Sequence, residues 1–149
     1  MSRAIEFGRL PNGEIVYEYE IRNDYATVHI LSYGAIIKDF IVKPLNRNIV
    51  LGYDSLEEYL KGTAYLGATV GRVANRIGGA RTVIGGKEYS WTPNNGPNLL
   101  HSGAVSLSFT NWQCKDDVAQ FDDSLVLTAK LHDDGFPGVL TVQLHVALV

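Results

Sequence analysis

The sequence predicts an all-β protein, an antiparallel β-sandwich. Apolar and polar residues alternate in several short runs, which is the pattern of half-buried strands. Turn-forming residues, above all Gly, Asn and Asp, separate these runs, and only one short segment carries helix signals. Many short strands with turns between them are typical of a sandwich or barrel. The 149 residues, 46% of them hydrophobic, are enough for a sizeable core in one domain or in part of a larger one.

The first strands are expected as a hairpin. Tyr17, Tyr19 and Ile21 fall on one face of a strand, with acidic residues between them on the other face. Asn12-Gly13 is a turn signal just before this strand, so Ile5 to Arg9 is expected to pair with it.

Three further strands and one helix are expected in the first half of the chain. Ala26 to Tyr33 and Ile36 to Val42 are rich in β-branched and aromatic residues and are broken by Gly34. Ile49 to Leu51 is expected as a short buried strand. The helix starts with a capping box, in which Ser55 accepts from the amide of Glu58 and Glu58 reaches back. The residues expected to share its buried face and to end it are Leu56, Tyr59, Leu60 and Gly62.

Strands return in the second half. Arg81 to Ile84 and Lys87 to Trp91 flank Gly85-Gly86, a two-residue hairpin loop in which both residues tolerate a positive φ. The remaining expected strands and the turns between them are Trp112 to Lys115, Asp116-Asp117, Ser124 to Leu131, Asp133-Asp134-Gly135 and Val139 to Val149.

The last strand is strongly patterned, with Leu140, Val142, Leu144, Val146 and Leu148 alternating with more polar residues. An apolar strand of this kind needs neighbours. Either it is central in a sheet, or the polypeptide has been cut short, in which case self-association through this strand is expected.

Composition excludes several classes of protein. The net charge is -3 with scattered charges, so nothing attracts a phosphate backbone and no nucleic-acid partner is expected. A single cysteine, Cys114, cannot form an internal disulfide. The first residues have no signal-peptide core and no apolar run approaches the roughly 20 residues of a membrane span. A cytoplasmic protein without a membrane partner is therefore expected.

The candidate chemistry lies on loops. An imidazole such as His101 can act as acid, base or oriented donor, although a surface loop histidine is the alternative. Arg76 offers a fork of donors and Asn75 offers a donor and an acceptor, a combination that suits sugar hydroxyls. The alternative for Arg76 and for Arg72 is a solvated basic patch.

The other candidates favour structural roles. A sheet-face position is expected for His29, the polar face of a strand for His145, and a turn for His132. Cys114 is expected as a packed thiol. No histidine or cysteine pair has the spacing of a zinc site.

Five segments, in this order, resemble motifs of the aldose 1-epimerases (galactose mutarotases). The family motifs read x-x-G-A, V-V-L-G-Y/F, G-R-x-x-N-R-I, N-x-x-N-x-L-H-G and D-G-F-P-G. The matching segments are Ser32-Tyr33-Gly34-Ala35, Ile49-Val50-Leu51-Gly52-Tyr53, Gly71-Arg72-Val73-Ala74-Asn75-Arg76-Ile77, Asn95-Gly96-Pro97-Asn98-Leu99-Leu100-His101 and Asp134-Gly135-Phe136-Pro137-Gly138.

The resemblance implies a galactose mutarotase-like β-supersandwich. It also implies an isomerase that interconverts the α and β anomers of free hexoses such as galactose or glucose, with no cofactor or metal. A base takes the proton of the anomeric hydroxyl while an acid protonates the ring oxygen, and the opened ring recloses on the other face. By resemblance, Arg76 and His101 have catalytic and substrate-binding roles, and Asn75 contacts the sugar.

The sequence departs from the family pattern in three respects. Ser102 replaces the Gly after the loop histidine, and Ser106-Leu107 replaces a Gly-Phe pair. The family's principal acid histidine, a sugar-binding aspartate and the base glutamate would lie beyond Val149. Residues 1–149 are therefore expected to be the N-terminal part of a mutarotase-like sandwich, incomplete at the C-terminus and inactive alone. The alternative is a non-catalytic sugar-binding module that keeps Asn75, Arg76 and His101.

Overall fold

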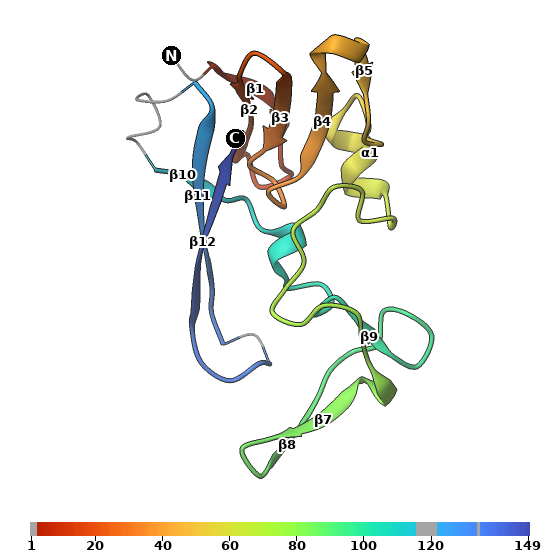
Figure 1. Ribbon diagram of the computed structural model, residues 1–149. Coiled ribbons are helices and arrows are strands. Elements are labelled where there is room, and N and C mark those ends of the chain that lie inside the picture. Colours follow the sequence, from red (N-terminus) through yellow and green to blue (C-terminus); the bar gives the residue numbers. More distant parts are fainter. Residues whose placement is uncertain (1–2, 116–121, 134) are drawn as a thin grey trace.

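Two antiparallel sheets pack face to face in the computed structural model, which describes residues 3–115, 122–133 and 135–149 (Figure 1). The first sheet has the order β1-β2-β3-β4-β5, and the second has the order β10-β11-β12. The predicted all-β sandwich is thus confirmed. The strands are β1 (Arg3–Arg9), β2 (Ile15–Arg22), β3 (Ala26–Leu31), β4 (Ile37–Val42), β5 (Arg47–Asn48), β10 (Gln113–Cys114), β11 (Ser124–Leu131) and β12 (Leu140–Ala147).

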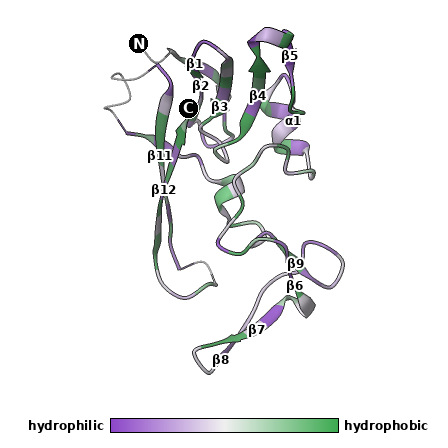
Figure 2. Cartoon of the chain, in the orientation of Figure 1, coloured by the Kyte–Doolittle hydropathy of each residue, from purple (hydrophilic) through white to green (hydrophobic). Residues whose placement is uncertain are grey.

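The main core lies between the two sheets. It forms because the alternating apolar residues of β2 and β3 point toward those of β11, as the period of two predicts. Figure 2 shows the same alternation as hydrophobic and hydrophilic residues along the strands. The buried residues of this core are Tyr19, Ile21, Val28, Ile30, Ala35, Leu107, Trp112, Leu125, Leu127, Ala129 and Leu131.

The N-terminal hairpin and the break at Gly34 are confirmed. β1 pairs with β2 in antiparallel register, with an irregularity between Glu6 and Gly8. Gly34 has a φ of +66°, and a Cβ there would come within 2.5 Å of the backbone oxygen of Ser108. Only glycine therefore fits at the point where the chain turns from β3 toward β4.

The expected buried strand at Ile49 to Leu51 is wrong. The ladder with β4 ends at Asn48, with one more hydrogen bond from the N–H of Ile49 to the carbonyl of Phe40, and the side chains of Ile49 and Leu51 are 57% and 78% exposed. The reason lies in the side chain of Asn48, whose Oδ1 accepts from the backbone N–H groups of Phe40 and Val50. This amide side chain takes up donors that a continuing strand ladder would use, and the chain leaves the sheet.

The helix α1 (Leu56–Lys61) forms where the capping box predicts it. Ser55 Oγ accepts from the amide of Glu58 and also donates to its carboxylate at 2.8 Å. Leu56 and Tyr59 are buried, whereas Leu60 is 39% exposed, so its expected place on the buried face is wrong. The six-residue helix has room for only one narrow apolar stripe.

Residues 76–100 form a loop-rich extension below the sandwich in Figure 1. The predicted hairpin is confirmed as β7 and β8, with positive φ at both Gly85 and Gly86, and its tip projects away from the sandwich. A second pair, β6 with β9, was not predicted. The elements not yet given are β6 (Arg76–Ile77), β7 (Arg81–Ile84), β8 (Lys87–Ser90), β9 (Leu99–Leu100) and the 3₁₀ turns η1 (Lys43–Leu45), η2 (Gly78–Ala80) and η3 (Leu107–Phe109).

The C-terminal strand β12 pairs along its whole length with β11 and, among the described residues, lies at the edge of its sheet. Its apolar residues are half-buried and pack against the main core. Asp116-Asp117 and Asp134, expected in turns, lie outside the described residues. Among the described residues, no helix is long and apolar enough to cross a membrane.

Candidate functional site

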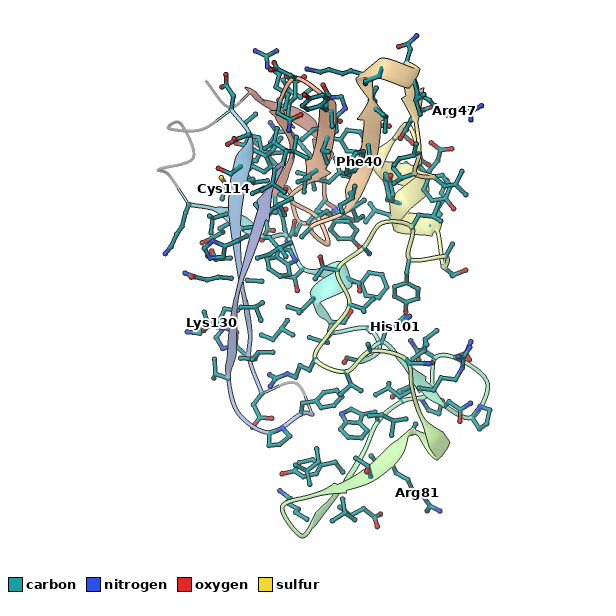
Figure 3. All side chains as sticks on the ribbon, in the orientation of Figure 1. Phe40, Arg47, Arg81, His101, Cys114 and Lys130 are labelled. Carbon is teal, nitrogen blue, oxygen red and sulfur yellow. The ribbon has the colours of Figure 1, made fainter. Side chains whose placement is uncertain are left out.

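The three candidate residues Asn75, Arg76 and His101 come together where two loops meet. These site loops, residues 65–75 and 93–103, are joined by the short β6–β9 pair, in which Arg76 lies opposite Leu100. The backbone N–H of Asn75 donates to His101 Nδ1 at 3.0 Å, and the N–H of His101 donates back to the Asn75 carbonyl at 3.1 Å. Figure 3 places His101 between the sandwich and the β7–β8 hairpin.

The bond from Asn75 determines how His101 can act. Because Nδ1 accepts from a backbone N–H, it carries a lone pair, and the proton of the neutral imidazole resides on Nε2. The ring is also packed edge-on against Tyr65, with centroids 4.8 Å apart. His101 therefore presents Nε2–H as an oriented hydrogen-bond donor, and it can accept a second proton only by giving up the bond to Asn75.

Arg76 is held by two side-chain acceptors. Its Nε donates to Asn95 Oδ1 at 2.8 Å, and its Nη1 donates to Asn75 Oδ1 at 3.1 Å. Nη2 makes no hydrogen bond with the described residues. The exposed guanidinium is thus fixed in orientation while part of its donor fork remains available to a ligand.

Asn95 and Tyr65 belong to the site although they were not singled out. Asn95 begins the matched N-x-x-N-x-L-H segment, so a signal for it was present in the sequence. Tyr65 has no such signal, because its contact with His101 depends on two loops meeting in space. The side chain of Asn94 stabilises the second loop, because its Oδ1 accepts from the N–H of Leu100 and its Nδ2 donates to the carbonyl of Leu100.

The site loops contain strained backbone. Tyr65, Asn75, His101 and Ser102 all have φ between +50° and +66°, a region that residues other than glycine rarely adopt. Ser102 is the position where the related motif has Gly. Its φ of +66° explains that preference, and its Oγ accepts from the N–H of Val73 at 2.8 Å, which offsets the strain.

Arg72 has a structural role, so the alternative of a solvated basic patch is wrong for this residue. Its Nη2 donates to the backbone carbonyls of His132 and Gly138 at 2.7 and 2.9 Å. The guanidinium also lies over the ring of Phe136, 5.9 Å from its centroid. Arg72 therefore binds the connection between β11 and β12 to the first site loop.

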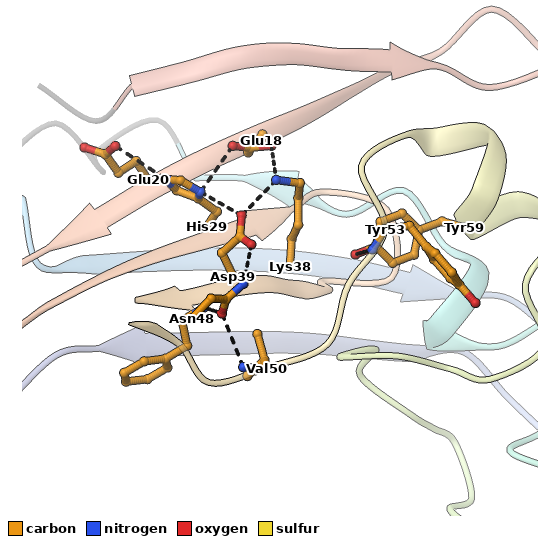
Figure 4. A network of polar contacts seen from close by, with 10 residues as sticks. Glu18, Glu20, His29, Lys38, Asp39, Asn48, Val50, Tyr53 and Tyr59 are labelled. Carbon is orange, nitrogen blue, oxygen red and sulfur yellow. Dashed lines mark hydrogen bonds and ion pairs between the residues drawn. The ribbon is translucent and has the colours of Figure 1, made fainter. Parts of the chain in front are cut away.

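The other candidate residues lie away from the site. His29 lies on the outer face of the first sheet, where it contacts Asp39 at 3.0 Å within a cluster of charged side chains (Figure 4). Cys114 is half-buried against the main core, as expected, while His132 and His145 are exposed. Within the described residues no group of three or more His, Cys, Asp or Glu side chains is placed to hold a metal ion.

The geometry suits a neutral, oxygen-rich ligand. Asn75, Arg76 and His101 supply oriented N–H donors from two loops, and none of the three bonds a carboxylate among the described residues. Such a site can bind hydroxyl and ring oxygens through hydrogen bonds, but these residues supply no carboxylate base.

Comparison with known proteins gives a consistent result. Residues 17–149 match the family model described as aldose 1-epimerase. Galactose mutarotase from Mus musculus is 39% identical over 91% of this chain and 40% of its own length. Aldose 1-epimerase from Streptococcus thermophilus is 32% identical over 95% of this chain and 42% of its own.

The solved structure of a GalM/aldose epimerase homologue from C. elegans superposes on 99% of this chain with a TM-score of 0.80 and 30% identity. The match covers 42% of that structure. The chain thus spans about two fifths of the length of these relatives.

Proposed function

Because the chain belongs to the aldose 1-epimerase family, we propose that its site loops bind a free hexose, such as galactose or glucose, and form part of a site that interconverts the two anomers. In this proposal residues 1–149 are the N-terminal part of a mutarotase-like domain. The observation that carries it is the reciprocal bonding of Asn75 and His101. This bonding orients the Nε2–H of His101, and Asn95 on the same loop as His101 orients Arg76.

In this proposal His101, Arg76 and Asn75 have different roles. The imidazole Nε2–H of His101 donates a hydrogen bond toward the sugar ring oxygen and so assists its protonation, as the ring opens, by an acid that lies outside these three residues. Arg76 and Asn75 bind hydroxyl oxygens and hold the sugar in one orientation, which lowers the entropic cost of the reaction. The base that removes the anomeric proton lies outside these three residues.

Catalysis by this chain alone is therefore expected to be negligible. Polarimetry of freshly dissolved α-galactose would show mutarotation at the rate of the buffer, with and without the 149-residue protein. Decay at the rate of a complete mutarotase would contradict the assignment of a partial site.

A non-catalytic sugar-binding module is the second candidate, favoured by the same donor set without a base. Calorimetric titration with galactose tests the binding that both candidates share. Arg76→Ala is expected to abolish binding, while Arg81→Ala, an exposed arginine on β7, serves as the matched control and retains it. A chain that binds no hexose at all would refute both candidates.

A further inference from the structure

We propose that Tyr65 is a positioning residue for His101. The aromatic ring of Tyr65, rather than its hydroxyl group, holds the imidazole in the plane from which Nε2–H is directed at a ligand. This role deepens the proposed function and rests on it, because the direction of one donor matters only in a site that binds the sugar. Tyr65 acts through His101 and is assigned no contact with the sugar itself.

The hydrogen bond from Asn75 does not by itself fix the direction of Nε2–H. It holds one ring atom of His101, Nδ1, at 3.0 Å from the backbone nitrogen of Asn75. The imidazole can still swing about the line of this bond, because the outer torsion of a histidine side chain has a broad energy minimum. Nε2 lies off that line, so a swing changes the direction of its N–H. A second contact is needed to fix it.

The ring of Tyr65 supplies the second contact. The two ring centroids are 4.8 Å apart and the ring planes meet at 73°, an edge-to-face arrangement that aromatic rings favour. The contact restrains the tilt of the imidazole plane, which is the motion that the bond from Asn75 leaves free. Bond and ring contact together define both the position and the plane of His101.

The sandwich in turn fixes the place of Tyr65. Its ring packs against Phe109 of η3, with centroids 5.6 Å apart, and its carbonyl accepts from the N–H of Ala68 in a tight turn. Within this turn the carbonyl of Gly67 accepts from the N–H of Ile37, the first residue of β4, at 3.0 Å. A Cβ at Gly67 would come within 2.2 Å of the carbonyl oxygen of Ile37, so the turn lies directly against the sheet.

A second pair of bonds, at Thr69, holds the same loop from both sides. The N–H of Thr69 donates to the carbonyl of Gly34, and its carbonyl accepts from the buried Oγ of Ser108, both at 2.9 Å. Figure 1 shows the first site loop passing close to the η3 turn on its way from α1 to β6. Tyr65 therefore stands on rigid structure, which is what a residue that orients a binding group requires.

The hydroxyl group of Tyr65 contributes less than the ring. It accepts from Asn94 Nδ2 at 3.5 Å, which is long for a hydrogen bond. Asn94 is already held by its shorter bonds with the N–H and the carbonyl of Leu100, at 2.6 and 3.0 Å. Removing the hydroxyl thus leaves the second loop in place. Phenylalanine should replace Tyr65, whereas a side chain without a ring should not.

NMR of the ¹⁵N-labelled, sugar-free chain tests the positioning role. The nitrogen signals of His101 show which ring nitrogen carries the proton. Wild type and Tyr65→Phe are expected to give one set of signals with the proton on Nε2. Tyr65→Leu should give broadened signals with the proton shared between the two nitrogens, because the ring then leaves Asn75 part of the time. A merely structural role would change the urea midpoint and leave the proton on Nε2.

Calorimetric titration with galactose supplies the second readout. Tyr65→Leu should raise the dissociation constant about tenfold, the equivalent of one lost hydrogen bond, and Tyr65→Phe should change it by less than about twofold. Tyr25→Leu, the same substitution at a side chain that is 71% exposed, is the matched control and should match wild type in both measurements. Circular dichroism establishes that each variant is folded, and Tyr65→Met decides the question if Tyr65→Leu is not.

Two results would overturn the role of Tyr65. One is a folded variant without the ring that keeps the proton on Nε2. The other is a Tyr65→Phe variant that is impaired as much as Tyr65→Leu, which would assign the effect to the hydroxyl. A wild-type chain that binds no galactose would refute the hexose proposal instead, and the sugar-free spectra would still decide whether Tyr65 positions His101.

Discussion

The sandwich and the site loops are stabilised in different ways. The sandwich has a core of closely packed apolar residues, in which Ile30 and Leu127 are fully buried. The site loops contain few such residues and are held by side-chain hydrogen bonds to backbone, around four non-glycine residues with positive φ. Stability therefore depends mainly on the sandwich, whereas the geometry of binding depends on the site loops. Substitutions should therefore separate the two properties.

The largest effect is expected from opening a cavity in the sandwich. Leu127→Ala at the centre of β11 should lower the free energy of unfolding by about 2–5 kcal/mol, because the buried site cannot fully collapse. Urea denaturation followed by circular dichroism measures it. Leu45→Ala, at a side chain that is 68% exposed, is the control and should change stability by less than about 0.5 kcal/mol. Similar losses of stability in Leu127→Ala and Leu45→Ala would contradict the claim that the core of the sandwich determines stability.

A smaller effect is expected at Ser102, where strain and hydrogen bonding oppose each other. Ser102→Ala keeps the positive φ and leaves the N–H of Val73 without its acceptor, which should cost about 1–3 kcal/mol. Ser102→Gly loses the same bond but relieves the strained backbone, so it should be less destabilising than alanine. The same urea titrations compare the two variants. Equal losses for both would show that backbone strain has no role at this position.

Asn95 should affect binding rather than stability. Asn95→Ala frees the guanidinium of Arg76 from its Nε acceptor, so Arg76 must be ordered by the sugar itself. The dissociation constant for galactose should rise about tenfold, which corresponds to the loss of one hydrogen bond of about 1.4 kcal/mol. Thr92→Ala, an exposed neighbour, is the control in the calorimetric titration. A stability loss with unchanged affinity would place Asn95 among the structural residues instead.

The smallest effect is expected from Asp39 in the charged cluster of the first sheet (Figure 4). Burial acts to raise the pKa of Asp39, but hydrogen bonds from Lys38 and His29 outweigh burial and leave the pKa below its ordinary value of 3.8. The folded state therefore binds this proton less readily than the unfolded state. The resulting stabilisation is present above the ordinary value and is lost as the pH falls below it.

Unfolding midpoints measured from neutral pH down to about pH 3 check this sign. Asp39→Asn should reduce the acid-side loss of stability by less than about 1 kcal/mol, because the cluster is partly exposed to solvent. A steeper acid loss in Asp39→Asn than in wild type would contradict the direction of the shift.

The sequence predicts the local structure better than the distant contacts. The Gly85-Gly86 hairpin and the Ser55 capping box follow from residues adjacent in the chain, and both are confirmed. The strand expected at Ile49 to Leu51 fails because the side chain of Asn48 competes for backbone donors. That competition depends on where Asn48 lies against β4, which hydrophobic patterning does not record.

The same limit applies to the site. Asn75, Arg76 and His101 are brought together as their motifs suggest, whereas the contact between Tyr65 and His101 and the role of Arg72 were not foreseen. Arg72 reaches residues about 60 positions away in the chain, so its partners become visible only in the folded structure. Spacing along the chain carries no information about such contacts.

The most direct test of the hexose-binding proposal is a galactose titration of the ¹⁵N-labelled chain followed by NMR. We expect signals of the Asn75 amide, the Arg76 Nε–H and the His101 Nε2–H to shift together and to saturate, while amides in the core of the sandwich stay in place. Shifts confined to residues outside the site loops, or no shifts at saturating galactose, would contradict the account.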